Sequence, residues 1–174
     1  MRTVVMGDPP PELDAWIARR RALGQDRFDE VWNGEYHMAP APHQWHSYLV
    51  TQLTAILQLH ANPLGLVTLD AFNLGVATNF RVPDLGLVRR LHDDVWVSTA
   101  AMVVEVVSPD DESWLKLDHY AAYGVDEVLI ADPQDRTLHL FVLVGGRYEP
   151  TGQSSLLDVS AAELHQAIAW PGSQ

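Results

Sequence analysis

The sequence predicts an α/β domain, and three patterns along the chain support this class. Apolar residues at helical spacing between His43 and His60 predict a long amphipathic helix. Short apolar runs at Met102–Val107 and Glu127–Ala131 are typical of buried strands. Asn33-Gly34 stands between alternating flanks and predicts the two-residue turn of a β-hairpin. The length of 174 residues suits one domain.

Composition narrows the class of protein further. A hydrophobic content of 47% is enough for a sizeable core, and the absence of cysteine excludes disulfides and thiolate metal sites. A net charge of −12 argues against broad electrostatic adhesion to DNA, so any nucleic-acid contact should be local. The N-terminal segment lacks the features of a signal peptide, and no apolar run approaches the ~20 residues of a membrane span. We therefore expect a cytoplasmic protein without a membrane segment.

The first element is predicted to be a helix that follows three prolines. Asp8 is a candidate N-cap, and Gly24 should end the helix. Four apolar residues fall roughly on one face of it: Leu13, Trp16, Ile17 and Leu23. The basic run at 19–21 points in several directions along a helix, which favours a solvated surface over a phosphate contact.

The hairpin comes next. Phe28, Glu30 and Trp32 should share one face because side chains alternate along a strand. Glu35 and His37 should share a face on the second strand. We expect this face to differ from the one that carries Glu30 and Trp32. From the pattern alone, Glu30 and Glu35 are interpreted as ordinary charges on edge strands.

Two histidines, His43 and His46, stand near the start of the long helix. Their spacing could serve zinc, but no third ligand is evident, so a structural or surface role is favoured. Asn62-Pro63 should end this helix. Short apolar strands follow, and Pro83-Asp84 opens the strand Leu85–Val88.

The remaining elements follow in order. Residues 91–98 are predicted to form a polar connection, and residues 112–123 an amphipathic helix. Thr137–Val144 is a further strand, which ends in a Gly145-Gly146 turn. The tail, 160–169, should be a helix that starts with a capping box formed by Ser160 and Glu163.

One carboxylate, Glu105, interrupts the apolar strand Met102–Val107. A charge inside a valine run costs several kcal/mol unless it is paired. A metal ion and Lys116, the only lysine in the chain, are the best candidate partners. A salt bridge to an arginine is the ordinary alternative, with three candidates: Arg81, Arg89 and Arg90.

Asp84, Glu105 and Lys116 together suggest a chemistry. Two carboxylates on neighbouring strands make an oxygen-rich site suited to Mg²⁺ or Mn²⁺. A lysine suits an attacking water or the charge that develops on a phosphate. These are the groups needed to cut a phosphodiester bond. The ordinary alternative for Lys116 is a surface position on the helix, paired with Glu112 or Asp118.

At these residues the sequence resembles a known group of nucleases. The matching segments are VPD at 82–84, VVEVVSP at 103–109, Lys116 and YAAYGV at 120–125. They resemble the PD-(D/E)XK superfamily, and more narrowly a bacterial family of restriction-endonuclease-like proteins of unassigned function. The EVWNGE hairpin at 30–35, His46 and Asp132-Pro133 also resemble that family, so the resemblance covers most of residues 28–144.

The resemblance implies a restriction-endonuclease-like fold, with a central mixed sheet flanked by helices. It implies that Asp84, Glu105 and the Val106 carbonyl bind the divalent ion, while Lys116 assists the attacking water. Glu35, together with Glu30, would line the same site. The superfamily pattern places its lysine two residues after the acid, where this chain has Val107, so Lys116 would have to replace it from the following helix.

We therefore expect a Mg²⁺- or Mn²⁺-dependent endonuclease that acts on DNA and forms a homodimer. One domain should span residues 1–174, with an N-terminal helix and hairpin at 9–40, a catalytic core at 43–144 and a C-terminal hairpin and helix at 145–174. A catalytically inactive module that binds nucleic acid or protein on the same fold is the main alternative. A purely structural homodimer is another.

Overall fold

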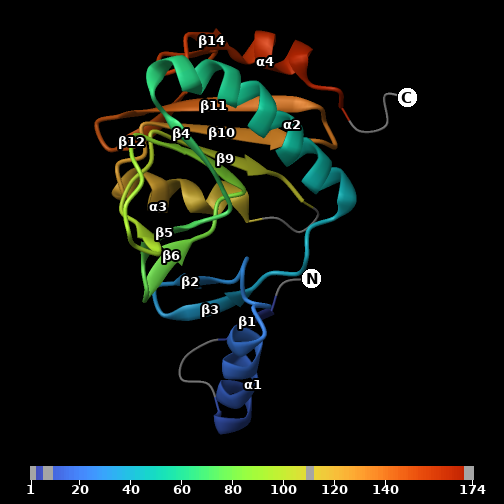
Figure 1. Cartoon of the computed structure of the whole chain (residues 1–174), viewed down its shortest axis with the longest axis vertical. Coiled ribbons are helices and arrows are strands. Elements are labelled where there is room, and N and C mark those ends of the chain that lie inside the picture. Colours follow the sequence, from blue (N-terminus) through green and yellow to red (C-terminus); the bar gives the residue numbers. More distant parts are fainter. Residues whose placement is uncertain (1–2, 6–9, 109–111, 171–174) are drawn as a thin grey trace.

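The computed structural model describes residues 3–5, 10–108 and 112–170, and in these ranges strands and helices interleave (Figure 1). The predicted Asp8 cap lies outside the described residues. The helices are α1 (Pro11–Ala22), α2 (Gln44–Ala61), α3 (Leu117–Ala122) and α4 (Ala161–Ala167), with 3₁₀ segments η1 (Asn62–Leu64) and η2 (Ser113–Lys116). The strands are β1 (Thr3–Val5), β2 (Glu30–Trp32), β3 (Glu35–Met38), β4 (Val67–Asp70), β5 (Asn73–Val76), β6 (Asn79–Arg81), β7 (Leu85–Val88), β8 (Trp96–Val97), β9 (Met102–Val106), β10 (Glu127–Asp132), β11 (Thr137–Val144), β12 (Arg147–Thr151), β13 (Gln153–Ser154) and β14 (Val159–Ser160).

The strands form two larger sheets. The first has the order β12-β11-β10-β9-β7-β4. It is mixed, because β9 and β10 run parallel while every other pair of neighbouring strands in it is antiparallel. The second has the order β1-β3-β2-β6-β5-β8. This architecture confirms the predicted α/β class with a central mixed sheet flanked by helices.

Alternation along β9 divides the core between two faces of the first sheet. Met102, Val104 and Val106 join the core cluster that α2 covers with Leu49, Leu53 and Leu57. Val103 belongs to the cluster on the opposite face, which contains Tyr120 of α3. Figure 1 shows α2 and α3 on opposite sides of this sheet. Glu105 has the same parity as Val103, so its side chain points toward α3.

Three elements differ from their predicted form. The helix expected at 112–123 is divided into η2 and the short α3, and the connection at 91–98 contains β8, which pairs with β5. On α1 only Ile17 of the predicted apolar face is buried, and Trp16 remains 44% exposed. Figure 1 shows why, because α1 projects away from the two sheets.

Other local predictions are confirmed. Asn33 and Gly34, both at positive φ, form the turn between β2 and β3. Ser160 and Glu163 make the capping box of α4. No helix in the described ranges combines the length and hydropathy required to cross a lipid bilayer.

Gly75 allows the β5–β6 hairpin to close just before the chain reaches Asp84. Its φ is +133°, and an added Cβ would lie 2.4 Å from the Asn79 carbonyl oxygen.

We predict that Gly75→Ala lowers the free energy of unfolding by about 2–4 kcal/mol, because the backbone must shift and the conformation is strained. Urea unfolding measures the loss. Gly152→Ala is the matched control, since its Cβ would meet no atom within 4 Å. Equal stability of the two variants would contradict the prediction.

Candidate active site

The candidate site is centred on the buried carboxylate of Glu105, which is 2% exposed. Lys116 Nζ donates to both carboxylate oxygens, at 3.0 and 3.1 Å. The hydroxyl of the fully buried Tyr120 donates to Oε1. Ser113 Oγ lies 3.5 Å from Oε2, a longer and weaker contact. Glu105 therefore has the lysine partner that its place in an apolar strand required.

The 3₁₀ form of η2 explains how Lys116 reaches the site. Residues three apart eclipse one another in a 3₁₀ helix, so Ser113 and Lys116 point to the same side, toward Glu105. The Lys116 side chain is only 6% exposed. The alternative of a surface position for Lys116 is thus wrong. The expectation that the lysine replacing Val107 could reach the acid is confirmed by its contacts.

The arginines offered as alternative partners of Glu105 make other contacts. Arg89 pairs with Asp126, and Arg90 donates to His92. Arg81 donates to the Val31 carbonyl at 2.9 Å, and its guanidinium lies over the Trp32 ring.

A second buried carboxylate, Glu30, also contacts the lysine. Its Oε1 lies 2.9 Å from Lys116 Nζ and accepts the Val82 N–H at 2.9 Å. Its Oε2 accepts the Trp32 indole N–H at 2.6 Å. Glu30 is fully buried. Its interpretation as an ordinary edge-strand charge is therefore wrong.

Asp84 immediately precedes β7 and lies beside Glu105 of the neighbouring strand β9. Leu85 pairs with Val104 in this antiparallel ladder, and one further step of the register brings Asp84 opposite Glu105. Asp84 Oδ2 accepts the Val106 N–H at 2.8 Å and lies 3.1 Å from His46 Nε2. His46, in the first turn of α2, thus holds Asp84. His43 instead caps α2 by accepting the Trp45 N–H, so the two histidines serve separate purposes.

Glu35 lies on β3, where it pairs with Trp32. Residues paired across an antiparallel ladder point to the same side, so Glu35 and His37 share a face with Glu30 and Trp32. The stacking of the Trp32 and His37 rings agrees with this, and the expectation of a different face is wrong. Among the described residues, no hydrogen bond or ion pair joins Glu35 to the other predicted site residues, and its place in the site stays a prediction.

The donor set suits a small, hard divalent ion. In the described ranges no three or more histidine, cysteine or acidic residues form a group that could hold a metal. Mg²⁺ keeps several of its waters and commonly binds through one or two carboxylates, which Asp84 and Glu105 can supply. The Val106 carbonyl stands next to Glu105 in sequence, as the resemblance requires.

Burial governs the electrostatics of the site. It raises the pKa of Glu105 from 4.5 to about 8, with the Lys116 charge opposing and the Asp84 and Glu30 charges reinforcing the rise. Burial also raises the pKa of Tyr120 well above its usual range, so its hydroxyl stays protonated and can donate. A divalent cation would offset the cost of the ionised Glu105.

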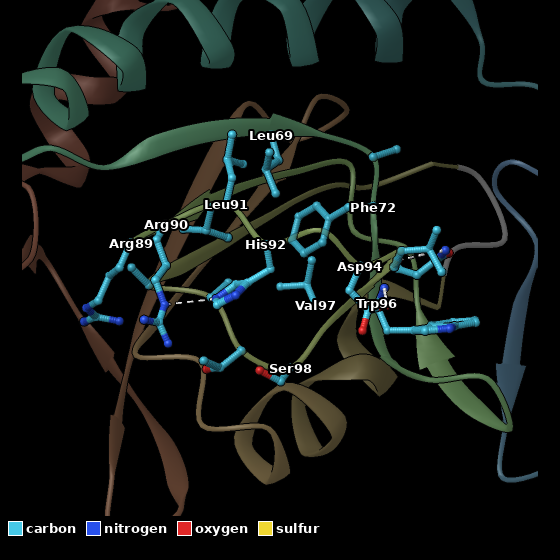
Figure 2. A pocket seen from close by; sticks show the side chains of 17 residues that line it. Leu69, Phe72, Arg89, Arg90, Leu91, His92, Asp94, Trp96, Val97 and Ser98 are labelled. Atoms are coloured by element: carbon cyan, nitrogen blue, oxygen red, sulfur yellow. Dashed lines mark hydrogen bonds between the residues drawn. The ribbon is translucent and has the colours of Figure 1, made fainter.

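A separate concave region lies at the other end of β7 and β9 (Figure 2). Its volume is about 750 Å³. Phe72, Trp96 and Val97 give it an apolar lining, while Arg90 and His92 lie at one side. The chain enters β9 there at Ala101, whereas Glu105 lies near the far end of that strand. This pocket contains none of the predicted site residues.

The pKa of Glu105 yields a prediction about stability and pH. A carboxyl whose folded pKa is raised stabilises most below its ordinary pKa, and its contribution is lost as pH rises through about 8. The free energy of unfolding should therefore fall more steeply between pH 5 and pH 9 in wild type than in Glu105→Gln. Mg²⁺ should reduce the fall in wild type alone, because the ion competes with the proton. Urea unfolding across this range measures both effects. Parallel pH profiles for the two proteins would refute the prediction.

The chain is similar to known proteins both in structure and in sequence. One solved structure similar to the chain is a protein of Anabaena variabilis described as a putative nuclease belonging to DUF820. Its TM-score is 0.64 at 15% sequence identity, over 80% of this chain and 90% of that one. This likeness supports the restriction-endonuclease-like fold. No curated protein is significantly similar to the chain.

A family model gives the decisive match. The model of the Uma2 family, described as putative restriction endonuclease, matches residues 11–169. This range contains every predicted site residue, together with the hairpin and the helices that hold them. The resemblance inferred from the sequence is thus confirmed, and the chain belongs to the Uma2 family of restriction-endonuclease-like proteins.

Proposed function

We propose that this protein is a divalent-metal-dependent endonuclease that hydrolyses DNA phosphodiester bonds. One observation carries the proposal. Lys116 Nζ lies 3.0 Å from Glu105, and the register of β7 and β9 places Asp84 opposite Glu105. Two acids and a lysine at one point are the groups required for phosphodiester hydrolysis. The description of the family supports a nuclease.

Asp84 and Glu105 would hold the ion, helped by the Val106 carbonyl. A bound Mg²⁺ or Mn²⁺ would supply Lewis acidity and lower the pKa of a coordinated water. Lys116 would orient the attacking water or neutralise charge on the phosphate. His46 keeps Asp84 in place, and Tyr120 does the same for Glu105. Glu35, on the face of the hairpin that also carries Glu30, would be an additional acid of the site.

The contact between this protein and DNA should cover only a small area. The net charge of −12 offers little general attraction to phosphates, so the bound cation would supply much of the local positive charge. The proposed homodimer is a separate expectation, which light scattering on the purified chain tests.

One observation favours a second candidate function. Both oxygens of Glu105 already accept hydrogen bonds from Lys116, and Tyr120 adds another. Such a pair can be purely structural, as in a catalytically inactive module that binds nucleic acid or protein. Calorimetry with Mn²⁺ separates the two functions, because an inactive module should show no binding that depends on Asp84.

Cleavage of plasmid DNA tests the proposed reaction. We expect wild type to cut in Mg²⁺ or Mn²⁺, and Asp84→Asn, Glu105→Gln and Lys116→Met each to lower the rate by about 100-fold or more. EDTA should abolish cutting. Glu149→Gln, at an exposed position on β12, is the control and should cut like wild type. A wild type that does not cut, or a Glu105→Gln variant that cuts at full rate, would rule out the proposal.

A further inference from the structure

Among the described residues, Lys116 contacts two carboxylates that differ in what surrounds them. Its ammonium lies 3.0 Å from Glu105 Oε1 and 2.9 Å from Glu30 Oε1. Glu105 stands beside Asp84, so it belongs to the pair of acids suited to a divalent ion. A cation bound there would compete with the lysine for the same oxygens and would repel its charge.

Glu30 is fixed in place without the help of Lys116. It comes from β2, in the second sheet, whereas Glu105 comes from β9 in the first. The Val82 N–H and the Trp32 indole N–H donate to its two oxygens, at 2.9 and 2.6 Å. These donors orient the carboxylate whether or not the lysine is present.

We propose that Glu30 is a positioning residue that keeps Lys116 at the site when a divalent cation takes over Glu105. The inference rests on the proposed function, because it assumes that a cation binds to Asp84 and Glu105. An ammonium group has several donors, so it can lose its bonds to Glu105 and keep the one to Glu30. Glu30 thus acts on the lysine and not on the metal.

The environment of Glu30 supports a role in holding Lys116, while Asp84 and Glu105 would hold the cation. Its Oε2 is taken by Trp32 and its Oε1 by Val82 and Lys116. Glu30 thus offers a lysine expelled from Glu105 a second buried carboxylate to pair with.

The lysine can be observed alone, because the chain contains only one. Protein labelled with ¹³C at the lysine ε carbon should give a single side-chain signal in an NMR spectrum. A held ammonium gives two inequivalent Hε protons, while a mobile one gives averaged protons. In wild type, Mg²⁺ should shift this signal and leave the two protons inequivalent.

The test variant combines Glu30→Gln with Trp32→Phe. Glutamine retains an acceptor for the Val82 N–H, and phenylalanine removes the indole donor that would face the new amide. Without metal the Hε protons should remain inequivalent, since Glu105 still holds Lys116, and this spectrum also verifies folding. Mg²⁺ should then average them. Trp32→Phe alone is the matched control and should behave like wild type.

Calorimetry with Mg²⁺ distinguishes failure of this inference from failure of the proposed function. No Mg²⁺ binding by wild type would overturn both. Binding that leaves the Lys116 signal unshifted, or a double variant whose lysine stays ordered in Mg²⁺, would overturn the role of Glu30 alone. Loss of Mg²⁺ binding in the double variant, as expected for Asp84→Asn, would make Glu30 a metal ligand and also overturn it. If the double variant does not fold, Glu30→Asp withdraws the carboxylate by one methylene and should give the same averaging in Mg²⁺.

Discussion

The bridge that Lys116 makes between Glu30 and Glu105 is the interaction on which this architecture depends. Each of the three ionisable side chains is buried, and a buried charge is tolerated only when it is paired and hydrogen-bonded. The two acids come from different sheets, so the lysine joins the sheets at the site. Removing one partner would leave a buried charge uncompensated, which typically costs about 3–5 kcal/mol.

The short segment between β6 and β7 reinforces this bridge. The Val82 N–H donates to Glu30, and two residues later Asp84 accepts the Val106 N–H beside Glu105. The chain therefore passes from one sheet to the other while making a hydrogen bond to each. His46 and Tyr120 add support from the helices on opposite faces. The acids are thereby held in position before any ligand arrives.

Much of this site could be predicted from the sequence, because a charge in an apolar strand demands a partner. That requirement pointed from Glu105 to Lys116 and, with Pro83-Asp84, to the pair of acids. The 3₁₀ form of η2 could not be predicted, since its residues suit an ordinary helix equally well. In the 3₁₀ form, Ser113 and Lys116 both reach Glu105 of β9.

The burial of Glu30 against Lys116 could not be predicted either, for a different reason. Its strand is only three residues long, and nothing in the local sequence shows that Glu30 is buried against Lys116. One signal was nevertheless present, because a two-residue turn at Asn33-Gly34 pairs Trp32 with Glu35 and Glu30 with His37. That register puts both acids on one face, and tertiary packing then selects Glu30 for the lysine.

The burial of Lys116 has a consequence for handling the protein. The chain has no other lysine, so its surface presents no lysine amine to acylating reagents, aldehydes or amine-coupled resins. The other ten of its eleven lysine and arginine side chains are guanidinium groups, which such reagents leave intact at neutral pH. Amine-directed conjugation should therefore spare the side chains of the folded protein, and acylation of Lys116 would report that the two sheets have separated.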